Sequence, residues 1–392
     1  MKTISYSKVL NTLFFLTIVL GIVGGGIQGV WAGTSMTELT RIANKQPIID
    51  FSFSGVDGNI NGPSLIRVPD WIDPEDRAHP NAKYYLYFSH HSGENIRLAW
   101  AKNIEGPYTM HAPNNGVLKL GINIGRLNVS DHIASPDVIV DNDNKRLLMY
   151  FHGGDVRWNN DKRGQSTLVA TSSNGLNFNG GVKESVLGKF YFRVFRHGGN
   201  LYALAKEGFV YRAQDANTPW ANPNGVDQSS KYVWTRSNNN PFSRVGGEVR
   251  HNAVYVDGDT LHVYYSYYPD KPEKILHSTI NLDQNWNSWT ASTPKTVLQP
   301  TLSWEGVNLP LKQSEEGSDT NVRQLRDPGF FKDIDGQMYL LYTGQGEEGI
   351  GLAKFNGALG ENQKPSVSFT KPKTSNVGAN VGVIVKASDS DG

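Results

Sequence analysis

The sequence has no cysteine among its 392 residues, which excludes disulfide bonds and metal sites built on thiolates. It also lacks an excess of either charge, because 38 basic and 37 acidic side chains leave a formal net charge of +1. Proteins that bind nucleic acids are usually clearly basic, so we expect no nucleic-acid partner. A P-loop, a dinucleotide-binding fingerprint and a Gly-x-Ser-x-Gly elbow are also missing. These absences argue against several large enzyme classes.

No apolar run reaches the roughly 20 residues that a membrane-spanning helix needs, but the N-terminus carries a shorter apolar segment. Lys2 and Lys8 give it a basic start, residues 13–23 form its apolar core, and residues 30–32 offer a small-residue cleavage site. This pattern predicts a signal peptide over residues 1–32. We therefore expect a secreted protein, extracellular or periplasmic, that has no membrane partner after cleavage.

Short β-strand signals fill most of the remaining chain. Glycine accounts for 41 residues and aromatic residues for 11% of the sequence. Five blocks each read as strand, tight turn, strand, turn, strand and a weaker fourth strand, with turn signals such as Asp257-Gly258 and Asp335-Gly336. The first strands of the blocks begin at residues 62, 135, 191, 251 and 327. The pattern predicts an all-β fold, a five-bladed β-propeller of four-stranded antiparallel sheets, over residues 33–361.

The two ends of this predicted domain differ from the blocks between them. A strand at residues 48–53 is expected to join the last blade and close the ring. From residue 362 to residue 392 the composition changes and resembles a linker followed by the start of an immunoglobulin-like or cadherin-like module. We expect this truncated segment to contribute nothing to the chemistry.

The residues that open the five first strands are the candidate functional residues. Side chains two apart on a strand face the same way, so alignment of the apolar cores gives two axis-facing positions in each strand. These positions are Gly62 and Ser64, Ser135 and Asp137, Tyr191 and Arg193, His251 and Ala253, and Asp327 and Gly329. Unpaired buried charges are costly, so the polar members need an explanation. They could neutralise one another in a structural ion-pair network, or they could form an active site.

We favour an active site, because further polar residues lie beside the same strand starts. The predicted catalytic residues are Asp137, His251, Asp327, His91 and Tyr191. The predicted substrate-binding residues are Arg193, Glu248, Arg250, His132, Arg326 and His90. Several arginines in one cleft indicate a ligand with carboxylate or sulfate groups, since the guanidinium fork matches such oxyanions. Each histidine taken alone could equally be a hydrogen-bonded structural group.

The sequence gives only a weak signal for a metal. Residues 141–144, Asp-Asn-Asp-Asn, are similar to a calcium loop but lack the glycine and the distal glutamate of an EF-hand, so a hairpin turn is the better interpretation. The sequence therefore identifies no cofactor. A structural calcium ion or another cation on the propeller axis remains an alternative.

Two short motifs resemble those of the five-bladed propeller glycosidases. Ser135-Pro136-Asp137-Val138, followed by the strand at 147–151, is similar to the second-blade motif of the arabinanase and xylosidase clan (family 43). Arg326-Asp327-Pro328 resembles a motif of the related invertase group, and the anhydro-galactosidases are further relatives. The resemblance covers residues 48–357 and implies a propeller in which Asp137 tunes the catalytic pKa and holds the sugar.

The sequence departs from that clan at two catalytic positions. Gly62 stands where the first blade normally has an aspartate base, and the third blade has Tyr191 and Arg193 where a glutamate acid is normal. Asp57, Asp327, Glu248 or a histidine would have to substitute. The resemblance allows a histidine acid, since some anhydro-galactosidases are thought to use one, and its pKa suits proton donation near neutrality.

We therefore expect a monomeric, exo-acting glycoside hydrolase that cleaves a complex, anionic polysaccharide of plants or algae, or its oligosaccharides. One alternative is a polysaccharide lyase, in which Arg193 and Arg250 neutralise a uronate carboxylate and a histidine or Tyr191 removes the adjacent proton. A second alternative is a carbohydrate-binding propeller without catalysis.

Overall fold

The structure is a computed structural model that describes most of the chain beyond the predicted signal peptide. It describes residues 35–357 except 54, 57, 113–114, 222–231 and 318–319, together with 366–369 and 385–388. The predicted signal peptide and most of the segment after residue 361 lie outside the described residues. No helix in the described part of the chain is long and apolar enough to span a membrane.

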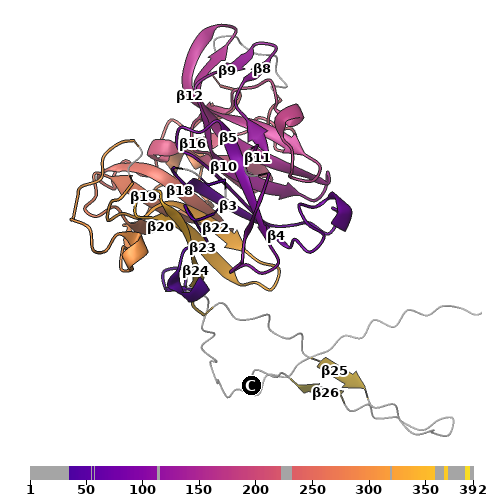
Figure 1. The fold of residues 1–392 in the computed structure, drawn as a ribbon, viewed down its shortest axis with the longest axis vertical. Coiled ribbons are helices and arrows are strands. Elements are labelled where there is room, and N and C mark those ends of the chain that lie inside the picture. Colours follow the sequence, from indigo (N-terminus) through magenta and orange to yellow (C-terminus); the bar gives the residue numbers. More distant parts are fainter. Residues whose placement is uncertain are drawn as a thin grey trace, which may run out of the picture. The chain divides into compact units, whose positions relative to one another are not determined.

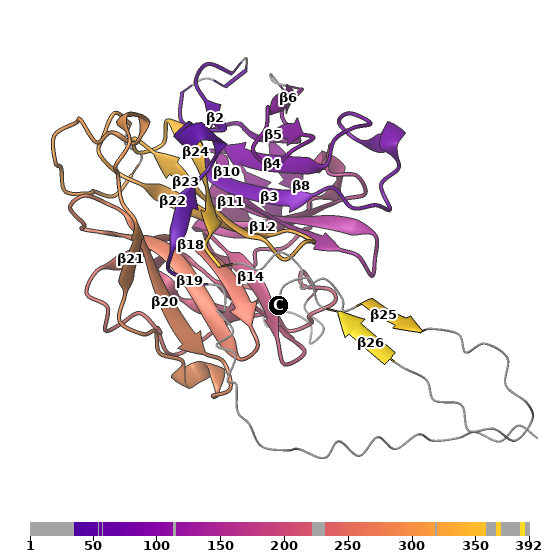
Figure 2. The ribbon, with the colours of Figure 1, turned by 90° about the horizontal axis from the view of Figure 1, so that it is seen from below.

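Five antiparallel sheets surround a common axis, which the inner strands β3, β10, β14, β18 and β22 line (Figures 1 and 2). Blade one contains β3 (Asn61–Arg67), β4 (Tyr84–Ser89), β5 (Asn95–Ala101) and β6 (Thr109–His111), with β7 (Leu118–Lys119) also on β5. Blade two contains β10 (Ile133–Asp141), β11 (Arg146–Trp158), β12 (Asp161–Ser172) and β13 (Gly188–Lys189). The hairpin of β8 (Ile122–Ile124) and β9 (Leu127–Val129) extends blade two along the far end of β11.

The remaining blades follow in chain order. Blade three contains β14 (Arg193–His197), β15 (Asn200–Leu204), β16 (Val210–Arg212) and β17 (Thr235–Arg236). Blade four contains β18 (Glu248–Asp257), β19 (Thr260–Tyr268), β20 (Ile275–Asn281) and β21 (Lys295–Leu298). Blade five contains β22 (Arg326–Lys332), β23 (Met338–Gly344) and β24 (Gly349–Phe355). Two short strands, β25 (Ser366–Phe369) and β26 (Val385–Ser388), pair with each other. The five-bladed all-β fold expected from the sequence is confirmed.

The helical segments that the structure describes are single 3₁₀ turns in the connections. They are η1 (Ala43–Lys45), η2 (Pro74–Asp76), η3 (Asn179–Gly181), η4 (Lys206–Gly208), η5 (Trp286–Ser288) and η6 (Ser303–Glu305).

N-terminal strands complete the fifth blade. The expected strand at residues 48–53 is present as β2 (Ile49–Asp50), which pairs antiparallel with β24. A second strand, β1 (Leu39–Arg41), lies further along the same edge of β24 and was not predicted, because its sequence is short and mostly polar. The two ends of the propeller domain therefore meet in one sheet, which removes an open edge.

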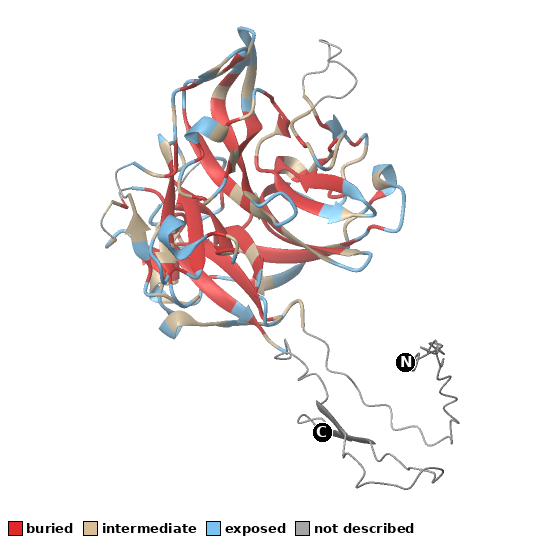
Figure 3. Cartoon of the chain, turned by 90° about the vertical axis from the view of Figure 1, so that its right-hand side faces the viewer, coloured by how far each residue is buried: buried red, intermediate tan, exposed pale blue. Residues whose placement is uncertain are grey.

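Five apolar clusters hold the ring together, one between each pair of neighbouring blades. Alternation along the strands sends successive side chains to opposite neighbours. Leu65 faces blade five while Ile66 faces blade two, and Leu148 faces blade three while Met149 faces blade one. Figure 3 shows the buried residues concentrated in the strands and the exposed ones at the turns.

Substitution of Leu341 tests the apolar cluster between blades five and one, which closes the ring. The Leu341 side chain is fully buried between these blades. Leu341→Ala is expected to lower the free energy of unfolding by about 2–5 kcal/mol, because it removes buried methyl groups and leaves a cavity. Chemical denaturation measures the loss. Ile334→Ala, at a side chain that is 74% exposed, is the control and should change stability by less than about 0.5 kcal/mol. Equal effects of the two substitutions would contradict the five-cluster ring.

Candidate active site

The inner strands begin with irregular backbone. The pairing register shifts near the starts of β3, β10, β18 and β22. Four residues at strand starts have left-handed backbone angles, namely Gly62 (φ 59°), Ser135 (φ 51°), Tyr191 (φ 64°) and Asp327 (φ 46°). Glycine adopts such angles freely, but they are uncommon for other residues and strained for a bulky tyrosine. Bulges and strain of this kind redirect side chains and are frequent beside active sites, so we place the candidate site at this end of the axis.

Two residues further along each inner strand, the axis-facing side chains line a cavity of about 260 Å³. Its lining includes the second member of each aligned pair: Ser64, Asp137, Arg193, Ala253 and Gly329. The alignment of the five inner strands made from the sequence is therefore confirmed at this level.

Asp137 and Arg193 face this axial cavity, and backbone groups hold them there. The Asp137 carboxylate accepts a hydrogen bond from the Val194 amide at 3.0 Å. Arg193 donates through Nε to the Asn252 carbonyl at 3.0 Å and through Nη1 to the Pro136 carbonyl at 3.2 Å. Burial raises the pKa of Asp137, and the positive charge of Arg193 opposes that rise. This geometry fits a structural pair on the axis better than a pair that binds substrate.

Asp327 and His251 come together at the strand starts. The Nδ1 atom of His251 lies 3.0 Å from Oδ1 of Asp327, and the two side chains are 3% and 1% exposed. Thr343 donates a hydrogen bond to the other carboxylate oxygen at 3.3 Å. Burial, and then the charges of Arg250 and Arg326, hold the pKa of His251 well below its usual value, so the imidazole is neutral. Both ring nitrogens of His251 are buried, and neither makes a hydrogen bond with a described residue, so the contact with Asp327 is one of close approach.

A second carboxylate–imidazole pair involves Glu347, which the sequence analysis missed. Glu347 lies in the turn between β23 and β24, and its Oε2 atom is 3.2 Å from Nδ1 of His91. Asn59 donates to the same oxygen at 2.5 Å, and Nη1 of Arg326 lies 3.4 Å from Oε1. The Glu347 side chain is 0% exposed but that of His91 is 22% exposed, so this pair reaches solvent through the histidine.

The two carboxyl groups differ in protonation. Burial, and then the negative charge of Glu347, raise the pKa of Asp327 to about 7. Burial alone would raise the pKa of Glu347 as well, but the hydrogen bond and charge of His91, together with Arg326, lower it to about 2. One acid therefore keeps a proton up to about neutral pH while its neighbour is ionised. Such divergence is typical of paired acid and base groups in enzymes.

Arg250 and Arg326 are bound within the protein. Both contact Oε2 of Glu273, at 3.2 Å and 2.9 Å, and their side chains are 3% and 0% exposed. Arg250 also donates to the carbonyls of Glu315, at 2.7 Å, and of Gly317. Buried guanidinium groups with these partners position the carboxylates of the site. Their geometry gives no support to the expectation that they bind an anionic substrate.

Tyr191 and His132 complete the group of polar residues at the axis. The Tyr191 ring packs edge-to-face against His251 and His152, with centroids 4.8 Å and 4.9 Å away. Nε2 of His132 lies 3.2 Å from Nε2 of His152, and its Nδ1 lies 2.8 Å from Asp131. Burial raises the pKa of Tyr191, so its hydroxyl keeps its proton. His152 is the second residue that the sequence analysis missed. We call the following residues the axial cluster: His91, His132, His152, Tyr191, His251, Asp327 and Glu347.

Two predicted binding residues are held by local contacts. His90 accepts a hydrogen bond at Nδ1 from the Ser92 amide, at 3.2 Å, in the turn after β4. The Glu248 side chain, 30% exposed, lies 3.3 Å from Nζ of Lys206 and accepts a hydrogen bond from the Tyr268 hydroxyl at 2.5 Å. Asp57, another candidate acid, lies outside the described residues.

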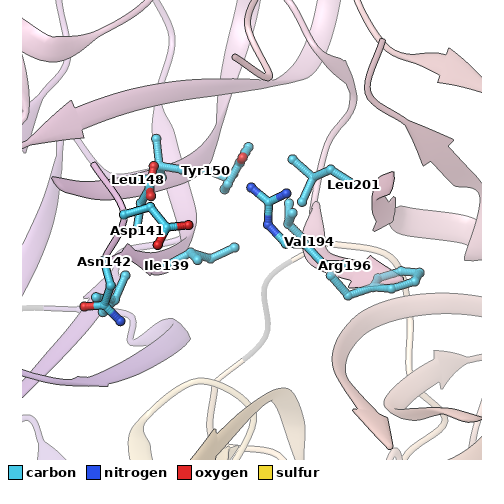
Figure 4. A pocket seen from close by; sticks show the side chains of 11 residues that line it. Ile139, Asp141, Asn142, Leu148, Tyr150, Val194, Arg196 and Leu201 are labelled. Carbon is cyan, nitrogen blue, oxygen red and sulfur yellow. The ribbon is translucent and has the colours of Figure 1, made fainter. Parts of the chain in front are cut away.

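Among the described residues, we find neither a metal-binding group nor another pocket that would replace the axial cluster as the candidate active site. The described part of the chain contains no group of three or more histidine, cysteine, aspartate or glutamate side chains placed to hold a metal ion. A pocket of about 350 Å³ lies between blades two and three, where β10 ends at Asp141 (Figure 4). The buried hydroxyl of Tyr150, which lines it, has no partner among the described residues. No residue of the axial cluster lines this pocket, so it is not the candidate active site.

The fold and the axial cluster define the protein as a five-bladed propeller with two carboxylate–imidazole pairs near its axis. No family model matches the sequence. The uncharacterized protein R118 of Acanthamoeba polyphaga mimivirus is 34% identical over 315 residues, which cover 76% of this chain and 84% of the relative. The chain belongs to the same family as R118.

Solved structures of glycosidases share the architecture at low sequence identity. A structure from the GH130 family of mannoside phosphorylases, which contains glycoside hydrolases that target β-1,2 mannosidic linkages in Candida mannan, aligns with a TM-score of 0.54 at 12% identity, over 84% of this chain and 96% of that chain. The α-L-arabinofuranosidase of Lactobacillus brevis aligns with a TM-score of 0.47 at 12% identity, over 83% and 93%. The GH130 structure confirms the resemblance to the propeller glycosidases at the level of the fold.

The opposite pKa shifts of Asp327 and Glu347 predict opposite effects on stability. The folded pKa of Asp327 is raised, so its ionisation destabilises the folded protein increasingly as pH rises from about 4 to about 7. The Asp327→Asn variant has no carboxyl group to ionise at this position. Its free energy of unfolding, relative to that of the parent, should therefore increase by more than about 1 kcal/mol between pH 4 and pH 8.

The folded pKa of Glu347 is lowered, so its contribution to stability is present at neutral pH and is lost as pH falls toward about 2. Glu347→Gln should therefore be less stable than the parent at pH 7, with the difference shrinking in acid. Urea denaturation across this pH range measures both effects. The same sign for both variants would contradict the assigned protonation states.

Proposed function

We propose that the protein is a secreted, exo-acting glycoside hydrolase that acts as a monomer on a polysaccharide or its oligosaccharides. The observation that carries this proposal is the pair Asp327 and Glu347, two buried carboxyl groups whose pKa values move in opposite directions. Glycosidases commonly use one carboxyl group that holds a proton and a second that is ionised. The fold shared with known glycoside hydrolases supports the same conclusion. The apolar N-terminal segment with its basic start supports secretion.

The Asp327–His251 pair can deliver a proton to the leaving oxygen. Neutral His251 would donate its Nε2 proton to the glycosidic oxygen while its Nδ1 atom, 3.0 Å from Asp327, takes the proton of the carboxylic acid. The raised pKa of Asp327 keeps that proton in place up to about pH 7. The two residues thus act as one acid, and the carboxylate left behind can take the proton back from water.

Glu347 would stabilise the sugar in the transition state, and His91 would contact the attacking water. The ionised Glu347 carboxylate stabilises the positive charge that develops on the sugar ring in an oxocarbenium-like transition state. His91, held at Nδ1 by Glu347 and 22% exposed, is placed to orient the attacking water by a hydrogen bond, while the Asp327–His251 pair takes the proton that this water loses. The burial of these carboxyl groups favours a chain end over the middle of a chain, which supports exo action.

A polysaccharide lyase is the second candidate, because the Tyr191 ring lies 4.8 Å from that of His251 and the two could share a proton abstraction. A lyase also needs a cation that can receive the uronate carboxylate. Arg193 donates to main-chain carbonyls and Arg250 contacts Glu273, which favours hydrolysis. The same contacts remove the main reason to expect an anionic substrate. Two carboxyl groups with opposed protonation favour an enzyme over a binding module.

Product analysis on a panel of neutral and anionic plant, algal and fungal polysaccharides tests the proposal. The parent protein should release reducing sugars from a chain end without the ultraviolet absorbance of an unsaturated uronate. Asp327→Asn and Glu347→Gln should each lower kcat by about 100-fold or more, because each removes a proton-transfer or charge-stabilising group.

Tyr150→Phe is the matched control for these variants. It also changes a buried polar side chain, but one that lines the pocket between blades two and three, so turnover should stay at the parent level. Full turnover in both carboxyl variants would refute the assigned site, and unsaturated products would refute hydrolysis.

The pH dependence of turnover gives an independent test. Activity requires a proton on the Asp327–His251 pair and an ionised Glu347, so kcat should fall as pH rises through about 7 and as it drops toward about 2. Circular dichroism at each pH separates loss of activity from loss of folding. A profile that keeps rising above pH 8 would show that Asp327 is not the acid.

A further inference from the structure

A groove on blade five lies outside the axial cluster and has no role in the chemistry described above. Its volume is about 250 Å³. Two aromatic side chains, Phe51 and Trp304, and three polar ones, Asp50, Gln345 and Glu348, contribute to its lining. The Phe51 side chain is 41% exposed, so part of its ring is open to a ligand in this groove. We call these five residues the blade-five groove.

The blade-five groove and the axial cluster occupy the same end of one sheet. Strand β22 starts at Arg326, beside Asp327, and the Arg326–Thr343 pair places the end of β23 there as well. The turn between β23 and β24 carries Glu347 into the axial cluster and contributes Gln345 and Glu348 to the groove. Strand β2 pairs with the start of β24, which brings the groove residues 50–51 to the same end.

Trp304 is a fixed platform in this groove. Its indole Nε1 donates to the Lys45 carbonyl at 2.8 Å, and its ring stacks on Tyr342 with centroids 5.8 Å apart and planes at 24°. The indole lies over Gly344 and Gly351, where any added Cβ would clash with it. The polar atom of the indole is already satisfied and the ring is held before any ligand arrives, so little ordering cost remains for a bound partner.

The polar side chains of the groove are acidic or neutral. Asp50 accepts hydrogen bonds at Oδ1 from the amide and the hydroxyl of Ser52, at 2.8 Å and 2.6 Å. Glu348 accepts from the Asn321 amide at 2.6 Å and from the side-chain amide of Gln345. Carboxylate and amide groups beside the exposed Phe51 ring and the half-buried Trp304 ring match the hydroxyl groups and apolar face of a sugar. The same carboxylates would repel a uronate or a sulfate ester.

We propose that the blade-five groove is a subsite for a further sugar unit of the substrate, and that this unit is uncharged. The inference rests on the proposed glycosidase function and deepens it by naming the class of glycan. The chain end enters the axial cluster while a more distant sugar lies on Trp304 and Phe51. Neutral chains of several units are then bound more tightly than short ones or acidic ones.

Binding and cleavage should be measured separately on the full chain. Isothermal calorimetry with Asp327→Asn would titrate xylo-, arabino- and manno-oligosaccharides from dimer to hexamer, with oligogalacturonates as the acidic comparison. In one of the neutral series, the affinity should rise by about tenfold between the dimer and the hexamer. Adding Trp304→Ala or Phe51→Ala should remove that gain and leave dimer binding unchanged. Phe51 is 41% exposed, so its replacement should leave the fold intact.

Ile334→Ala is the matched control, since it removes an exposed apolar side chain in the β22–β23 turn, at the other end of the same blade. It should leave the gain with length in place. A gain that survives both aromatic substitutions, or oligogalacturonates that bind as tightly as neutral chains, would overturn the subsite. A change in oligomeric state in the aromatic variants would also overturn it, by showing a contact between copies.

Different results would refute the glycosidase function and the blade-five subsite. If the parent cleaves neutral chains but the aromatic variants keep the gain with length, the subsite falls and the glycosidase stands. If the aromatic variants lose the gain but the parent cleaves no member of the panel, the glycosidase falls and the groove stands as a binding site for glycans.

Discussion

The burial of ionisable groups on the axis is the constraint on which the rest of the site depends. Five inner strands converge there, so any charge must find a partner within the protein. Arg250 and Arg326 are matched by Glu273 and Glu347. Asp327 is left with a neutral histidine as its close partner and with Glu347 as a repelling neighbour. Its retained proton is a direct result of this balance, and that proton is what the proposed chemistry uses.

Blade five combines closure of the ring with both carboxyl groups of the axial cluster. Asp327 is the second residue of its strand β22, its β23–β24 turn carries Glu347, and its outer edge receives the N-terminal strands β1 and β2. The groove with Trp304 lies at the same end of this blade. The sheet that completes the propeller therefore also carries the two carboxyl groups of the proposed active site, which links stability of the fold to the geometry of the site.

Much of the fold could be predicted from the sequence, because alternation along strands and turn residues are local signals. The same alternation placed Asp137, Arg193, Ala253 and their counterparts correctly around the axial cavity. Strand β1 was missed, since a short polar strand has little periodicity of its own. The bulges at the strand starts were missed as well, because left-handed backbone at Ser135 or Asp327 leaves no trace in residue type.

The chemistry of the site was predicted less completely than its position. His91, His132, Tyr191, His251 and Asp327 do come together, as the strand starts indicated. Glu347 and His152 come from a turn and a second strand, which an alignment of inner strands cannot reach. Only the cluster Gln345-Gly346-Glu347-Glu348 beside a strand could have pointed to one of them. The partners of Arg193 and Arg250 depend on long-range contacts, so their structural roles could not be separated from substrate binding beforehand.

The proposed chemistry requires that Asp327 and Glu347 titrate far apart. Carbon-13 NMR of the side-chain carboxyl groups, assigned with Asp327→Asn and Glu347→Gln, measures this directly. The account predicts that the Asp327 signal shifts near pH 7, while Glu347 stays ionised down to about pH 2. Two carboxyl groups that both titrate near pH 4, the usual value for exposed acids, would contradict it.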